Sequence, residues 1–171
     1  MAARTASLSG TPEGGRRIVP ANAPAGFRMS IDADLDEVGK VNATLSHFAD
    51  AHGLPAAIRR GMNVVLDELL TNTVSYGFAG RDDGKVTIEA ELQPDRLTVT
   101  LTDNGRAFDP FGRVAPDTTL SVEARPIGGL GIHLVGRLLD EISHQRRGDQ
   151  NVVVLVKLLR AGEQRVSAEG G

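Results

Sequence analysis

Apolar residues recur at helical spacing in two consecutive segments of this 171-residue chain. The first segment, 32–52, begins with two aspartates, Asp32 and Asp34, either of which can cap a helix. The second segment, 55–76, begins with a proline, a residue suited to the first turn of a helix. Gly53 separates the two segments, and glycine commonly ends helices. The pattern therefore predicts two helices joined by a short turn, each with one apolar face.

The apolar period then falls to two. Residues 86–92 and 97–102 each alternate apolar with polar side chains, and Gln93-Pro94-Asp95 separates them. This arrangement predicts an antiparallel hairpin with one buried face. A short extended piece over residues 27–31 precedes the helices. Two more strands are predicted near the end of the chain, over 141–146 and 151–159.

Residues 105–129 have no usable period and contain three prolines, which is typical of a functional loop or lid. A third helix is predicted from Leu130 to about Leu139. The order is then strand, helix, helix, two strands, lid, helix and two strands. This order predicts an α/β two-layer sandwich, with the helices on one face of a mixed, mostly antiparallel sheet.

Both ends of the chain are rich in small and polar residues that cannot bury enough apolar surface to order themselves. We therefore expect a disordered N-terminal tail over 1–26, one domain over 27–160 and a disordered C-terminal tail over 161–171. The chain has no cysteine, which excludes disulfide scaffolds, thiolate metal sites and cysteine nucleophiles. Its net charge of -3 argues against nonspecific nucleic-acid binding, and no apolar run is long enough for a membrane span. We expect a cytoplasmic protein that contacts neither nucleic acid nor membrane directly.

Glu68 and Asn72 form the first candidate functional pair. A spacing of four residues puts the carboxylate and the amide on one face of the second helix, one turn apart. An asparagine carbonyl can ligate Mg²⁺ together with phosphates and water, and a neighbouring glutamate can take a proton from a hydroxyl nucleophile. Taken alone, the pair is more typical of a solvated helix surface than of a functional site.

Two further motifs flank the predicted lid. Asp103 and Gly105 belong to an Asp-Asn-Gly turn at a strand end; this carboxylate could accept a hydrogen bond from an exocyclic amine such as that of adenine. Gly128-Gly129-Leu130-Gly131 opens the third helix, where exposed N–H groups suit phosphate, although the spacing is not that of a dinucleotide fingerprint. Taken alone, the Asp-Asn-Gly motif is typical of an ordinary turn, and the glycine-rich motif is typical of a flexible turn. Together, in this order around a lid, the three motifs describe an ATP site without a P-loop.

These motifs resemble those of a known superfamily, the GHKL ATPases, which have the Bergerat fold. Its N box is similar to LDELLTNTVSYGF, its first glycine box to LTDNGRAFDP, and its second to RPIGGLGIHLVGRLLDEI. The resemblance covers about residues 27–160. The compact form with two leading helices is more narrowly similar to the RsbW-type anti-sigma-factor serine/threonine-protein kinases.

The resemblance implies ATP and Mg²⁺ as cofactors and assigns roles to individual positions. Asn72 would ligate Mg²⁺ and Glu68 would be the general base. Asp103 would bind the adenine amino group, with Gly105 packed under the ring. The phosphates would lie against the second glycine box, at Gly129, Leu130 and Gly131.

The resemblance also implies partners. The phosphorylated substrate would be a serine on an anti-anti-sigma protein of the STAS type, with a sigma factor as the alternative partner and a homodimer as the assembly. Two positions depart from the family pattern: Tyr76 stands where many relatives have a basic residue, and Val152 to Val154 stand where relatives often offer a Thr or Ser to the adenine. We therefore assign no site to either position.

Two classes of function remain after this comparison, with a water-attacking ATPase as a lesser third. One is a kinase that moves the γ-phosphoryl group of ATP to a protein serine. The other is a nucleotide-gated binding module, an anti-sigma regulator without kinase activity. The presence of both Glu68 and Asn72 favours the kinase over the binding module. Glu68 also argues against a histidine kinase, because a hydroxyl nucleophile benefits from a base that a histidine nucleophile does not need.

Overall fold

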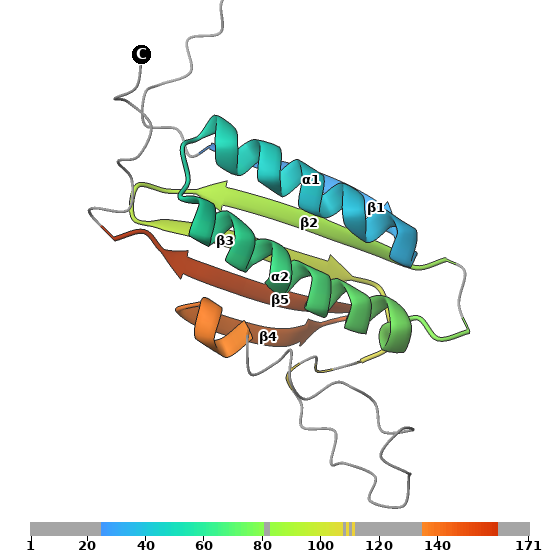
Figure 1. Cartoon of the computed structure of the whole chain (residues 1–171). Helices are drawn as coiled ribbons and strands as arrows, with labels where there is room; N and C mark the ends of the chain where they lie inside the picture. The colour runs from blue at the N-terminus through green and yellow to red at the C-terminus, as the bar shows by residue number, and fades with distance from the viewer. Residues whose placement is uncertain (1–24, 81–82, 108, 110, 112–134, 161–171) are drawn as a thin grey trace, which may run out of the picture.

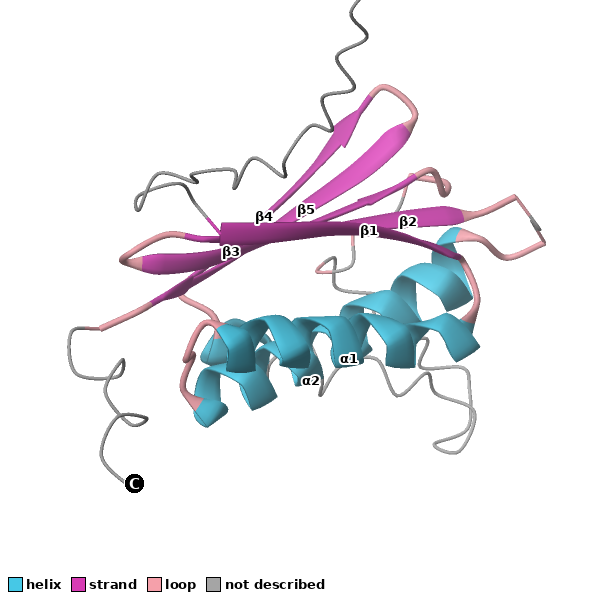
Figure 2. Ribbon diagram, turned by 90° about the horizontal axis from the view of Figure 1, so that it is seen from above, coloured by secondary structure: helices cyan, strands magenta, loops and turns pink. Residues whose placement is uncertain are grey.

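The computed structural model describes residues 25–80, 83–107, 109, 111 and 135–160. These residues form two layers, a five-stranded sheet and a pair of helices that cover one of its faces (Figures 1 and 2). The strand order across the sheet is β1-β2-β3-β5-β4. The bounds of the strands are Ala25–Asp32 for β1, Lys85–Leu92 for β2, Arg96–Asp103 for β3, Glu141–Arg147 for β4 and Gln150–Leu158 for β5.

The architecture is the predicted α/β sandwich with its helices on one face. All four described strand pairings are antiparallel, so this part of the sheet contains no parallel pair. Strand β1 begins at Ala25, two residues before the predicted extended piece. The predicted lid lies outside the described residues except at its start, and the predicted third helix is described only as a helical turn over 135–138. Residues 1–24 and 161–171 also lie outside the described part.

Helix α1 (Leu35–Ala51) begins where the sequence predicts. The side chain of Asp34 accepts a hydrogen bond from the backbone N–H of Asp36 at 3.0 Å, which satisfies one of the free donors at the helix start. Gly53 has a φ of 66°, in the left-handed region that favours glycine, and so allows the chain to turn after the helix. Of the two aspartates that could cap this helix, Asp34 is therefore the one that does so.

Helix α2 (Ala56–Asn72) and the turn that continues it span the predicted helical segment. The chain does not stop coiling at Asn72 but widens into a π-helical turn, η1 (Thr73–Gly77). The backbone carbonyls of Tyr76 and Gly77 accept hydrogen bonds from Arg106, at the end of another strand. The last carbonyls of a helix have no donor within the helix, and Arg106 satisfies two of them here; π-turns are frequent at functional sites.

The core lies between the helices and the sheet and is aliphatic. Leu97, Val99 and Leu101 of β3 are buried while the threonines between them are partly exposed. A slip of one residue in the strand pairing would therefore turn threonines into the core, so the apolar pattern fixes the register. Each fully buried aliphatic side chain contributes about 1.5–3 kcal/mol to folding. The largest fully buried side chains are Leu45, Met62, Leu66, Leu69, Leu70, Ile88, Leu97 and Leu155.

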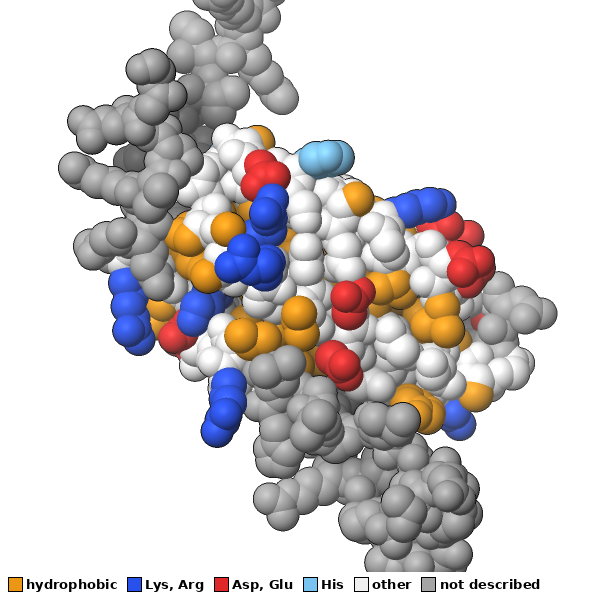
Figure 3. Space-filling model, viewed as in Figure 1, with side chains coloured by type: hydrophobic (Ala, Val, Ile, Leu, Met, Phe, Trp, Pro, Cys, Tyr) orange, Lys and Arg blue, Asp and Glu red, His pale blue; other side chains and the backbone are white. Residues whose placement is uncertain are grey.

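The outer surface of the helix layer carries charges of both signs. Figure 3 shows basic and acidic side chains interspersed with small separate apolar patches over the described part of this face. Within the described residues, no helix has both the length and the apolarity needed to cross a membrane.

Candidate functional site

Three parts of the fold lie at one end of the molecule. The carboxyl end of β3, the end of α2 with η1, and the hairpin between β4 and β5 all lie at the same end (Figure 1). The register places Asp103 of β3 opposite Asn151 of β5, and Asn151 opposite Arg146 of β4. The polar residues of three adjacent strands therefore share one row at this edge.

Asp103 is the centre of this row. Its side chain is buried, with the residue 6% exposed, yet it carries a carboxylate. The Oδ1 atom accepts two hydrogen bonds of 2.8 Å, from the backbone N–H of Gly105 and from Nδ2 of Asn151. The Oδ2 atom accepts none from another described residue. The described part of the chain thus satisfies Oδ1 of this buried carboxylate. Oδ2 can accept a hydrogen bond from a ligand.

Gly105 lies where no larger residue fits. A Cβ atom at this position would stand 2.8 Å from Oδ1 of Asp103 and 2.9 Å from the carbonyl oxygen of Gly77. The glycine therefore lets the turn after β3 close against the end of the long helix. This is a requirement of the protein's own packing, and it stands beside the role under a nucleotide ring that the resemblance implies.

The two flanks of α2 have different partners. On one flank, Asn63 Nδ2 donates to the hydroxyl of Ser46 at 2.9 Å, and Asp67 accepts from Nδ2 of Asn42 at 2.5 Å. Both partners belong to α1. This flank is therefore occupied by the neighbouring helix.

Glu68 and Asn72 lie on the opposite flank, away from α1. They share it with Gly61, where a Cβ atom would lie 3.5 Å from the Leu138 side chain. Both residues are half-buried, and neither side chain forms a hydrogen bond with another described residue. A carboxylate and an amide at a helix edge, on the side where residues 135–138 pack, are thus available to a ligand.

Arg106 joins the helix end to the row of strands. Its Nε donates to the carbonyl oxygen of Tyr76 at 2.6 Å, and its backbone N–H donates to the carbonyl oxygen of Gly77 at 3.0 Å. The carbonyl oxygen of Arg106 in turn accepts from Nδ2 of Asn151 at 2.9 Å. The flank that carries Asn72 and the strand end that carries Asp103 are thereby held in a fixed relation.

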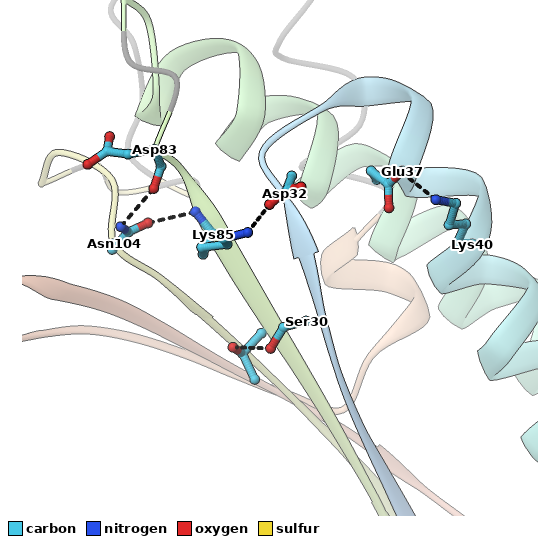
Figure 4. Close-up of polar contacts among 8 residues, drawn as sticks. Ser30, Asp32, Glu37, Lys40, Asp83, Lys85 and Asn104 are labelled. Atoms are coloured by element: carbon cyan, nitrogen blue, oxygen red, sulfur yellow. Dashed lines mark hydrogen bonds and ion pairs between the residues drawn. The ribbon is translucent and has the colours of Figure 1, made fainter.

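Asn104, in the middle of the turn motif, has a structural role. Its Oδ1 accepts from the backbone N–H of Lys85 at 2.8 Å and its Nδ2 donates to the carbonyl oxygen of Asp83 at 3.3 Å (Figure 4). The Lys85 ammonium group is paired with Asp32 of β1 in the same view. These contacts fix the start of β2 against the end of β3, so Asn104 points away from the row that Asp103 begins.

Sequence reasoning missed Asn151, Arg146 and Arg106. The available signal was the pairing register: the hairpin of β4 and β5 brings Asn151, the second residue of β5, opposite Asp103, the last residue of β3. Asn151 directly precedes the apolar run that begins at Val152, so its position near the start of a strand could be read from the sequence. The structure shows that this polar residue is buried, with 3% of its surface exposed. Gly129, Leu130 and Gly131, predicted to contact phosphates, lie outside the described residues.

The described residues could bind Mg²⁺ only together with a phosphate-containing ligand that supplies further oxygen ligands. No group of three or more His, Cys, Asp or Glu side chains in the described part of the chain could hold a metal ion. Mg²⁺ commonly takes one or two protein ligands and completes its shell with phosphates and water. The amide of Asn72, which forms no hydrogen bond with another described residue, matches that smaller requirement.

Comparison with known proteins identifies the family. Residues 31–157 match the model of the histidine kinase-like ATPase domain. The chain belongs to this family, a group of ATP-binding, kinase-like domains of the GHKL type. The match covers helices α1 and α2 and strands β2 to β5 almost completely, but only the last two residues of β1.

Relatives of known name within this family are serine-protein kinases. A protein named serine-protein kinase RsbW from Listeria monocytogenes is 30% identical over 118 residues, which cover 67% of this chain and 75% of the relative. One of the same name from Bacillus cereus is 32% identical over 134 residues, covering 76% of this chain and 82% of the relative. Among solved structures, the RsbU and RsbW domains of Rv1364c from Mycobacterium tuberculosis superpose with a TM-score of 0.56 at 14% identity. This alignment covers 78% of the chain but 32% of that longer structure, and it shows a common fold.

Proposed function

We propose that this chain is an ATP-dependent serine/threonine-protein kinase that phosphorylates a serine on a STAS-type anti-anti-sigma partner. Its regulatory setting would be a partner-switching system in which a sigma factor is the alternative partner. The proposal rests on membership of a kinase-like ATPase family and on relatives named serine-protein kinase. A homodimer and a cytoplasmic location belong to the same proposal.

The observation that supports the proposal most is that the fold places two sets of polar side chains at one end, on different elements. One is Asp103 at the end of β3, and the other is Glu68 with Asn72 on α2. Asp103 is buried, and its Oδ2 accepts no hydrogen bond from another described residue, so it suits the amino group of adenine. Glu68 and Asn72 lie on the flank of α2 that is not occupied by α1. A nucleotide whose base contacts Asp103 would direct its phosphates along that flank.

The roles of the individual residues follow from their chemistry. Asn72 would hold Mg²⁺ through its amide oxygen, and Glu68 would accept the proton of the attacking serine hydroxyl. When bound, Mg²⁺ supplies electrostatic stabilisation of the transferred phosphoryl group. Gly129, Leu130 and Gly131 would offer backbone N–H groups to the phosphates. Gly105 would allow the base to approach the backbone closely.

A transfer assay tests the proposal. The full chain, a purified STAS-domain protein from the same organism and γ-labelled ATP with Mg²⁺ are incubated, and the label is located by mass spectrometry. We expect label on one serine of the partner. Label found only as inorganic phosphate would indicate a water-attacking ATPase. ATP binding with no turnover, together with nucleotide-dependent capture of the partner, would replace the kinase by the nucleotide-gated binding module.

A further inference from the structure

Asn151 has a single orientation that its neighbours impose. Its Oδ1 accepts from Nη1 of Arg146 at 2.9 Å, and its Nδ2 donates to Oδ1 of Asp103 at 2.8 Å and to the carbonyl oxygen of Arg106 at 2.9 Å. A flipped amide would set its oxygen against a carboxylate and its nitrogen against a guanidinium group, and all three bonds would be lost. The donor side of Asn151 therefore faces Asp103.

Arg146 holds this arrangement from the surface side. The residue is exposed, and the same Nη1 also donates to the carbonyl oxygen of Gly105 at 2.8 Å. One guanidinium nitrogen thus bridges the amide of Asn151 and the turn that follows Asp103. The chain of contacts runs from an exposed arginine through a buried asparagine to a buried carboxylate.

This chain of contacts determines which oxygen of Asp103 is free. Two donors already occupy Oδ1, from Asn151 and Gly105. With Oδ1 fixed, the carboxylate cannot rotate without breaking both bonds, and Oδ2 has one direction in which to accept. An ionised carboxylate only accepts hydrogen bonds, so it favours a base with an exocyclic amino group and repels a base with an oxo group there.

We propose that Asn151, held by Arg146, is a positioning residue that aims Asp103 and thereby sets the preference for a 6-amino over a 6-oxo purine. This inference deepens the proposed function and rests on it. Asn151 itself need not touch the nucleotide. Its contribution is to keep the recognising carboxylate in one rotamer, which is how a supporting residue sharpens the selectivity of a contact that another residue makes.

The test compares ADP with IDP, which differ at the 6-position of the purine and cannot undergo γ-phosphoryl transfer. Dissociation constants for both are measured by calorimetry on the full chain and on Asn151→Ala, Arg146→Ala and Gln145→Ala. Gln145 is the matched control, an exposed residue next to Arg146 on β4 that belongs to none of these contacts. We expect the full chain and Q145A to prefer ADP by at least about tenfold, the value of one good hydrogen bond to a charged acceptor.

In N151A and R146A we expect that preference to fall to about threefold or less, while IDP binding changes little. Thermal unfolding checks that each variant is folded; if N151A does not fold, R146A, altered at an exposed side chain, carries the test. An unchanged ADP-to-IDP ratio in both variants overturns the inference and leaves the proposed function intact, as does an equal loss of both nucleotides, which indicates a merely structural role. Failure of the unaltered chain to bind either nucleotide overturns the proposed function itself.

Discussion

The side chain of Arg106 and the backbone of Tyr76 are joined by a hydrogen bond of 2.6 Å between Nε and the carbonyl oxygen. This bond crosses from the turn after β3 to the π-helical end of α2. It is reinforced by the backbone bond from Arg106 to Gly77. The two elements that carry the proposed base-binding and metal-binding groups are therefore held together by one residue that sequence motifs do not single out.

Removing that contact should weaken nucleotide binding without unfolding the protein. Arg106 is exposed, so Arg106→Ala costs little apolar burial. The substitution removes the side-chain bond to Tyr76 and keeps the backbone bond to Gly77, so it weakens the link between the end of α2 and Asp103. We expect the affinity for Mg²⁺ with an ATP analogue to fall about tenfold, as for the loss of one charge-assisted hydrogen bond. Arg147→Ala is the matched control, because Arg147 is exposed and has no described partner. Equal affinities in the two variants, measured by titration calorimetry, would refute the coupling.

Gly105→Ala should both destabilise the fold and impair the site. The added Cβ would stand within 3 Å of Asp103 Oδ1 and of the Gly77 carbonyl oxygen, so the turn must open. We expect a loss of about 1–3 kcal/mol in the free energy of unfolding, measured by urea denaturation. Gly39→Ala is the control: it lies in α1 with nothing within 4 Å of the added carbon, and should gain about 0.5–1 kcal/mol. A neutral G105A would show that the turn is looser than its contacts indicate.

Glu68→Gln should separate binding from transfer. The substitution keeps size and helix propensity but removes the basic carboxylate, so ATP affinity should stay within about twofold while phosphoryl transfer falls by at least about 100-fold. Asp67→Asn changes the neighbouring carboxylate on the flank occupied by α1 and should retain transfer. Transfer by E68Q at the rate of the unaltered chain would refute the assignment of Glu68 as the base.

Asp140 should contribute stability that depends on pH in the acid range. Hydrogen bonds from the backbone N–H of Leu158 and from the Lys157 ammonium group, each 2.9 Å, hold the pKa of the Asp140 carboxyl below its usual 3.8. A lowered folded-state pKa means that the stabilisation is complete above the unfolded-state pKa and is lost as pH falls through the folded-state value.

The measurement is the free energy of unfolding of the unaltered chain and of Asp140→Asn between pH 2 and pH 7. Asp140→Asn should be less stable by about 1–2 kcal/mol near neutral pH, and the difference should shrink as the pH falls below about 4. A difference that stays constant with pH would show that Asp140 acts through packing alone.

The elements predicted most accurately are those whose pattern is set by burial on one face. The hairpin of β2 and β3 follows the alternation of apolar and polar residues, and the start of α1 follows its capping aspartate. The helical segment ends at Gly77, close to its predicted end, but the pattern did not predict that the carbonyls of Tyr76 and Gly77 are satisfied by Arg106, about 30 residues away in the sequence. Local propensity contains no record of such a partner.

The residues of the candidate site also differ in how well the sequence predicted them. Asp103 and Gly105 stand in a recognisable turn motif, and the spacing of Glu68 and Asn72 places them on one helix flank. Asn151 was missed because its importance depends on pairing with Asp103 across two strands that are distant in sequence. A burial of 97% for an asparagine becomes informative only after that register is known.

The most direct test of the central claim is a calorimetric titration of the full chain and of Asp103→Ala with a non-hydrolysable ATP analogue, with and without Mg²⁺. The account predicts binding by the full chain that Mg²⁺ strengthens, and a loss of about 10–100-fold in affinity in D103A, since the acceptor for the adenine amino group is removed. Equal affinity in D103A would contradict the base-binding role of Asp103, and no binding at millimolar nucleotide would contradict the site as a whole.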